Sequence, residues 1–163
     1  MMSLRGSLRA LLLGAVLVAA LSVSRAAHAQ LSNTDKQTLA ELALRWAVDG
    51  GIPDVGLMKD PAQVFVEDHN LPPRPQLHVP QRTVTVASRI HLQAEADLHG
   101  DFLYFHFGPI TGEQSRASVP ITLVWAVGIG SKAVYLSGGG TTLQFELRHD
   151  KWTLLPVTER WTS

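Results

Sequence analysis

Four side chains able to donate or accept protons lie close together in the sequence: Asp97, Asp101, Tyr104 and His106. Tyr104 and His106 are two residues apart in a predicted strand, so their side chains share one face, and Asp101 lies at the start of that strand. A tyrosine donor beside a carboxylate can serve a metal-independent isomerase, hydratase or lyase. A structural interpretation competes, because Tyr and His are common on half-buried strands and either aspartate can cap a turn.

A second cluster has the residue types of a metal site. His91, Glu95 and His99 follow one another at intervals of four, which places them on one face of a helix and also of a strand. Zinc sites normally pair two histidines four residues apart with a distant third ligand, so this spacing fits zinc poorly. We therefore interpret the three residues as a solvated polar face, and we predict neither a metal nor a cofactor.

Two other polar or glycine-rich stretches favour structural interpretations. Gly138-Gly139-Gly140 precedes a strand, whereas a phosphate-binding loop precedes a helix, so we predict a β-bulge or a bend there. Glu67-Asp68-His69-Asn70 lacks the ligand number and the loop glycine of a calcium site, so we predict a surface turn.

The first 29 residues have the order of a secretory signal peptide. Arg5 and Arg9 precede an uncharged run from Ala10 to Ser24, and Ala27-His28-Ala29 supplies the small residues of a cleavage site. The uncharged run is short for a membrane anchor, although an uncleaved anchor is the alternative. We therefore expect residues 1–29 to be removed, residues 30–163 to form one domain without a membrane span, and the protein to be periplasmic or secreted.

Charge excludes some classes of partner for the expected domain. The 14 basic residues fall to 11 when Arg5, Arg9 and Arg25 are removed, against 14 acidic ones, which leaves a net charge near −3. A nucleic-acid-binding domain normally carries a basic stripe, and none is present, so we expect no nucleic-acid partner. The chain has no cysteine, so its hydrophobic core must supply the stability.

The elements that position these side chains begin with a helix. Ser32 and Asp35 form a capping-box pattern, an apolar stripe includes Leu39, Ala43 and Trp46, and Gly50-Gly51 ends a helix predicted over 33–49. A proline-rich connector at 71–80 separates possible strands at 64–66 and 83–86. Residues 90–98 alternate like a strand but contain helix-forming residue types between Ser88 and Gly100, so we favour a short helix.

Strands are predicted in the C-terminal half. Five β segments separated by turn signals cover 102–107, 117–127, 133–136, 141–148 and 152–157. A helix followed by an antiparallel meander is an α+β order. The expected fold is an N-terminal helix packed on a curved antiparallel sheet of four to five strands.

The order of elements resembles the cystatin-like superfold, which includes the nuclear transport factor 2-like domains. Locally, segments of uncharacterised bacterial exported proteins resemble about residues 88–163, on the motifs Ala96-Asp97, Gly100-Asp101-Phe102, Tyr104, Trp125, Ser137-Gly138-Gly139-Gly140 and Lys151-Trp152. The superfold implies a curved sheet wrapped around a helix. Neither resemblance implies an activity, because such folds host enzymes and non-enzymes alike.

Two function classes follow from the sequence. The preferred class is a non-catalytic module of the cell envelope that binds a small apolar ligand or a protein partner. The alternative is the metal-independent enzyme that uses Tyr104, His106 and either Asp97 or Asp101. The large apolar residues Leu103, Phe105 and Phe107 alternate with Tyr104 and His106, so we expect them to fill the core and the two polar residues to face outward.

Overall fold

The computed structural model describes residues 30–113, 115–133 and 138–161. From Leu31 onward the described residues form one compact unit, and the expected signal peptide lies outside the described residues. None of the helices in the described part of the chain has both the length and the apolar character needed to cross a membrane.

The first described helix, α2 (Asn33–Trp46), begins at the predicted capping box. The Ser32 hydroxyl accepts a hydrogen bond from the Asp35 amide at 3.0 Å, and the Asp35 carboxylate accepts one from the Ser32 amide at 3.3 Å. Leu39 and Ala43 are fully buried. The helix ends three residues before the predicted position 49, and a π turn (Ala47–Gly51) and a 3-10 turn (Pro53–Leu57) follow it.

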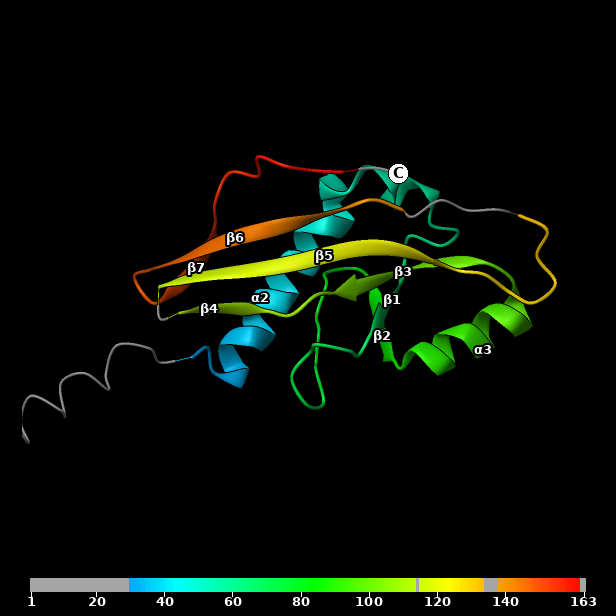
Figure 1. Ribbon diagram of the computed structural model, residues 1–163, viewed down its shortest axis with the longest axis horizontal. Helices are drawn as coiled ribbons and strands as arrows, with labels where there is room; N and C mark the ends of the chain where they lie inside the picture. The colour runs from blue at the N-terminus through cyan, green and yellow to red at the C-terminus, as the bar shows by residue number, and fades with distance from the viewer. Residues whose placement is uncertain (1–29, 114, 134–137, 162–163) are drawn as a thin grey trace, which may run out of the picture. The chain divides into compact units, whose positions relative to one another are not determined.

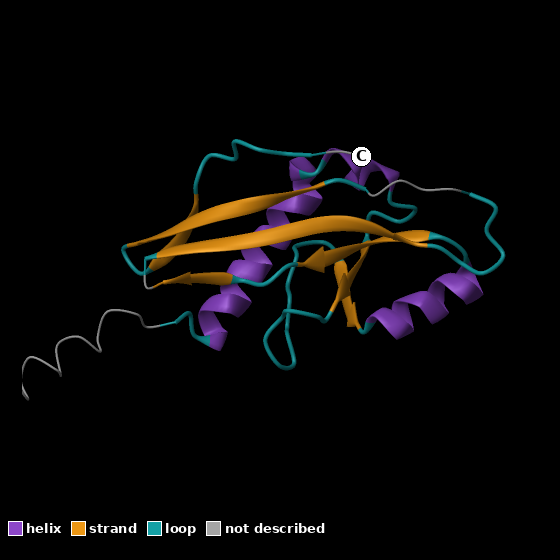
Figure 2. Ribbon diagram, in the orientation of Figure 1, coloured by secondary structure: helices purple, strands orange, loops and turns teal. Residues whose placement is uncertain are grey.

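Within the described residues, seven strands form one curled sheet beside α2 (Figures 1 and 2). Their spatial order is β2-β1-β3-β5-β6-β7, and β4 pairs with β5 outside this path. The bounds are β1 (Gln63–Glu67), β2 (Thr83–Ala87), β3 (Phe102–Phe107), β4 (Thr111–Glu113), β5 (Arg116–Ala126), β6 (Gly140–Arg148) and β7 (Lys151–Leu154).

The α+β class is confirmed, but the prediction of a purely antiparallel sheet of four to five strands is wrong. The sheet is mixed, because β1 pairs in parallel with both β2 and β3. Parallel neighbours need a long crossover connection, and residues 68–82 and the helix after β2 supply two of them. The predicted strands at 64–66 and 83–86 therefore exist and extend the sheet. The predicted strand at 133–136 lies almost entirely outside the described residues.

Residues 90–98, which alternate like a strand, lie in a helix, α3 (Arg89–His99), as their residue types favoured. The Ser88 side chain caps its first turn, and Gly100 follows its last residue with a φ of 84°. On a helix, strict alternation distributes apolar residues over opposite sides. Leu92 and Ala96 are buried on one side, whereas Ile90 is 82% exposed and Leu98 is 77% exposed.

The two helices cover opposite faces of the sheet. On the face toward α2, Leu103, Phe105 and Phe107 of β3 join the main hydrophobic core, as predicted from their alternation. On the other face, Tyr104 packs in a smaller cluster that includes Leu92 of α3. In Figure 1, α2 crosses behind the long strands, and α3 lies toward one end of the sheet.

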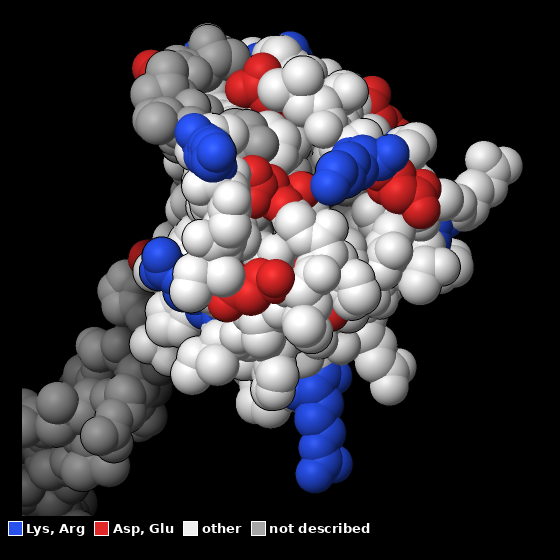
Figure 3. Space-filling view, turned by 90° about the vertical axis from the view of Figure 1, so that its right-hand side faces the viewer, with Lys and Arg blue, Asp and Glu red and all other residues white. Residues whose placement is uncertain are grey.

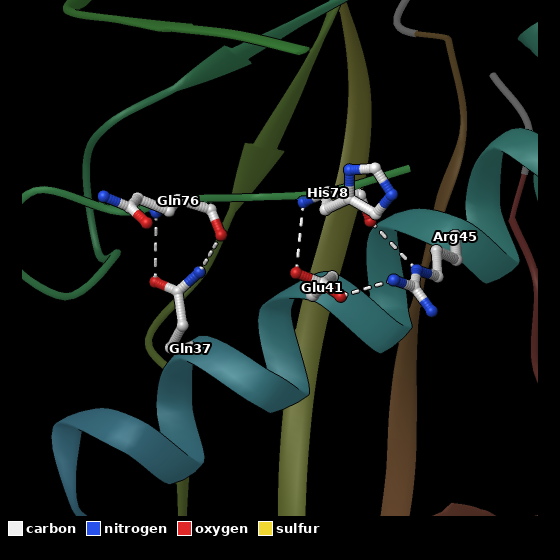
Figure 4. A network of polar contacts seen from close by, with 5 residues as sticks. All are labelled: Gln37, Glu41, Arg45, Gln76 and His78. Carbon is white, nitrogen blue, oxygen red and sulfur yellow. Dashed lines mark hydrogen bonds and ion pairs between the residues drawn. The ribbon is translucent and has the colours of Figure 1, made fainter. Parts of the chain in front are cut away.

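The proline-rich connector lies along α2 as an extended segment (Figure 4). Gln37 exchanges side-chain hydrogen bonds with the main chain of Gln76, Glu41 accepts from the His78 amide at 3.1 Å, and Arg45 donates to the His78 carbonyl at 2.9 Å. Arg45 also pairs with Glu41 at 2.6 Å. Three helix side chains thus satisfy backbone groups of a segment that has no strand neighbour.

The triple glycine forms a bulge beside β5, as predicted. The Leu123 carbonyl accepts a hydrogen bond from the Gly138 amide at 3.0 Å, and the Leu123 amide donates to the Gly139 carbonyl at 2.9 Å. Two residues thus oppose one, which defines a β-bulge. A Cβ on Gly138 would lie 2.9 Å from the Leu123 carbonyl oxygen, so only glycine fits this close approach.

Candidate functional site

The two aspartates of the sequence-predicted acid–base site bind the loop that follows β5. Asp101 accepts hydrogen bonds from the Gly128 amide at 2.8 Å and the Ser131 hydroxyl at 2.6 Å, and Asp97 accepts one from the Ile129 amide at 2.9 Å. A Cβ on Gly128 would lie 2.4 Å from the Ala96 carbonyl oxygen, so this loop packs tightly on the end of α3. The structure therefore gives both carboxylates the turn-capping role that was the alternative interpretation.

The carboxylate beside His106 belongs to Glu67. Phe65 of β1 aligns with Tyr104 of β3 in parallel register, so the next residue on the same face of β1, Glu67, lies beside His106. The Glu67 carboxylate is 2.8 Å from His106 Nδ1, and Glu67 as a whole residue is 7% exposed. The imidazole of His69 stacks on that of His106 with ring centroids 6.3 Å apart.

Tyr104 is buried, whereas the sequence analysis expected it to face outward. It is 5% exposed, because α3 covers this part of the second sheet face. Burial raises the pKa of its phenol, and the negative charge of Glu67 raises it further. His106 remains one-third exposed at its side chain. Neither Tyr104 nor His106 lines the α3–β1 pocket described below.

Within the predicted polar face on α3, Glu95 contacts His99. Glu95 and His99 approach to 3.5 Å with both side chains largely exposed, whereas the His91 imidazole is 2.9 Å from the Ser88 hydroxyl at the start of the helix. Within the described part of the chain, no group of three His, Cys, Asp or Glu side chains has the geometry to hold a metal ion. Glu95 and His99 instead lie at the edge of a pocket.

This pocket, which we call the α3–β1 pocket, has a volume of about 300 Å³ and lies between the last turns of α3, the chain before β1 and the start of β3. The half-buried rings of Phe65 and Phe102 form part of its wall, with centroids 4.6 Å apart. The residues that line it are Met58, Lys59, Asp60, Gln63, Phe65, Glu95, His99, Gly100, Asp101, Phe102 and Leu103.

Charged side chains surround the aromatic wall of the α3–β1 pocket. Lys59 and Asp60 come from the segment before β1, and Glu95 and His99 come from α3. Figure 3 faces the end of the domain where α3 ends, and it shows acidic and basic side chains interspersed there. The pocket thus combines an apolar wall with a polar rim, as small-molecule sites commonly do.

The structure brings together part of each sequence-predicted site and adds residues that the sequence analysis missed. Glu95, His99 and Asp101 meet at the α3–β1 pocket, although they were assigned to two different sites. Lys59 and Phe65 were missed, because they reach the pocket only through the parallel pairing of β1 with β3. The alternation of Phe65 with the buried Val64 and Val66 was the available signal that it faces away from the main core.

Comparisons with protein-family models, with curated proteins and with solved structures find no match to this chain.

Proposed function

We propose that this protein is a non-catalytic binding protein that holds a small, partly apolar molecule in the α3–β1 pocket. The observation that carries the proposal is the Phe65–Phe102 ring pair, which is half-buried in a pocket of about 300 Å³ instead of being sealed in a core. This volume is at the lower end of the range for ligand sites, so the ligand is small. Aromatic rings contribute large apolar contact areas, which favours an apolar ligand body.

Binding of octanol tests this proposal. We expect isothermal titration calorimetry to detect octanol binding to the purified protein, and we expect Gln63→Trp to weaken it at least tenfold. Gln63 is exposed and lines the pocket, so a larger side chain fills the pocket without entering the core. Thr142→Trp, at an exposed position of β6 that does not line the pocket, is the matched control and should bind octanol normally.

Two outcomes contradict the proposal. The first is no binding of octanol, octanoate or octylamine, which share one tail and differ in charge. The second is equal octanol binding by the wild type and a folded Gln63→Trp variant. If that variant unfolds, His99→Trp fills the pocket from an exposed position at the end of α3 and replaces it in the experiment.

We also propose that the protein is exported and that its domain is related to the cystatin-like superfold. The order of basic, apolar and small residues at the N-terminus supports export to the periplasm or beyond. A curled sheet beside a long helix supports the superfold, whereas the parallel pairing of β1 departs from an antiparallel pattern. An intact mass that lacks residues 1–29 in envelope fractions is the expected result, and a full-length mass contradicts cleavage.

The second candidate is a metal-independent isomerase, hydratase or lyase. The contact of 2.8 Å between Glu67 and His106 favours it, because a carboxylate that orients an imidazole is a common acid–base arrangement. The carboxylate in this candidate is Glu67 and not Asp97 or Asp101. The candidate ranks second because neither Tyr104 nor His106 lines the α3–β1 pocket.

A further inference from the structure

The charged side chains at the rim of the α3–β1 pocket differ in whether other residues of the domain already form hydrogen bonds or close contacts with them. Three carboxylates and one ammonium group line the pocket, which at first favours a cationic ligand. The hydrogen bonds of these groups, however, determine which charge remains available to a ligand. A charge that already has fixed partners gains less from a ligand than one whose only partner is water.

Each carboxylate at the rim has a partner within the domain. Asp60 accepts a hydrogen bond from the Ala62 amide at 2.8 Å. Asp101 accepts from the loop after β5 through both of its oxygens. Glu95 lies 3.5 Å from the His99 imidazole. The acidic side chains therefore stabilise the walls of the pocket.

Lys59 differs from these carboxylates. It is exposed, and it forms no hydrogen bond or ion pair with any residue that the structure describes. Its ammonium nitrogen lies 3.6 Å from the position that a Cβ on Gly100 would occupy, so the side chain reaches the residue that follows α3. Among the residues that the structure describes, no other lysine or arginine lines the pocket. The available charge beside the Phe65–Phe102 wall is therefore positive.

We propose that the ligand class of the α3–β1 pocket is a small amphipathic carboxylate, with an alkyl or aryl body against Phe65 and Phe102 and its carboxylate on Lys59. This inference rests on the proposed binding function and adds the charge of the ligand to it. The tail gains from removal of apolar surface from water, and the carboxylate gains a charge-assisted hydrogen bond from the ammonium group.

Three probes with one tail separate the charge from the apolar contact: octanoate, octanol and octylamine. We expect octanoate to have the lowest Kd and octylamine the highest by titration calorimetry. Lys59→Met should weaken octanoate binding about two- to fivefold, as expected of an exposed ion pair, and should leave the Kd of octanol unchanged. Lys151→Met, an exposed lysine on β7 outside the pocket, is the matched control and should change neither value.

A second variant tests the role of the carboxylates. Asp60→Asn keeps an oxygen that can accept from the Ala62 amide and removes a negative charge from the rim, so it should tighten octanoate binding. Octanoate that binds no better than octanol, or that is unaffected by Lys59→Met, overturns the ligand class while the binding function stands. Failure of all three probes to bind overturns the binding function as well.

Discussion

Glu67 shows how the surroundings of a single side chain decide what it can do. A buried carboxylate is costly unless it is paired, and His106 supplies the partner at 2.8 Å. The same negative charge acts on Tyr104, where burial and Glu67 both raise the phenol pKa. Tyr104 therefore keeps its proton through the neutral pH range.

The raised pKa of Tyr104 predicts a change in stability at alkaline pH. The folded state favours the neutral phenol, so the contribution is fully present below the unfolded-state pKa of about 10 and is lost as pH rises through the higher folded-state pKa. The urea midpoint of the wild type should thus fall more steeply above pH 10 than that of Tyr104→Phe, which has no phenol at this position. Parallel curves for the two proteins would show that Tyr104 titrates normally.

The hairpin between β6 and β7 is an element whose turn residues are poorly suited to its backbone. Arg148 pairs with Lys151, so His149 and Asp150 alone form the turn, with φ values of 49° and 60°. Two-residue turns of this kind favour glycine at the second position, because positive φ strains other residues.

Asp150→Gly should therefore stabilise the domain by about 0.5–1 kcal/mol, since it relieves the positive φ without loss of any described contact. Equilibrium urea denaturation measures the change. His149→Ala keeps a side chain at the other position of positive φ and should not stabilise the domain. Equal or lower stability of Asp150→Gly would show that the turn is not strained.

Local sequence signals predicted that both helices exist and where they begin. They could not predict which strands pair with each other. Ser32 with Asp35, and Ser88 with Gly100, mark helix ends through contacts within a few residues. The mixed sheet depends on β1 lying between β2 and β3, which two long crossovers create. Nothing near Glu67 in the sequence indicates a partner 39 residues away.

Only some residues of the candidate site were predicted, because the others reach it through long-range contacts. Glu95 and His99 were grouped by helical spacing, and their contact at 3.5 Å confirms that they are neighbours. Asp101 was placed in one predicted site with Tyr104 because they are close in sequence. Its carboxylate instead accepts a hydrogen bond from the loop after β5. Lys59 belongs to no local sequence motif, and it lies beside Gly100 only in the folded domain.

At the scale of the whole described domain, the sheet separates a closed core from a more open second face. The face toward α2 contains most of the buried apolar side chains, whereas the short helix α3 covers only part of the other face. The α3–β1 pocket and the Glu67–His106 pair are both associated with this less covered face. The proposed function depends on which of the two places receives a ligand.

Amide chemical-shift mapping during a titration with octanoate tests this choice most directly. We expect the largest shifts at the α3–β1 pocket, at the amides of Phe65, Gly100 and Phe102, because these residues line it. The amides of β6 should remain unchanged and serve as the internal control. Shifts centred on Glu67 and His106, or shifts that do not saturate at any site, would contradict ligand binding in the α3–β1 pocket.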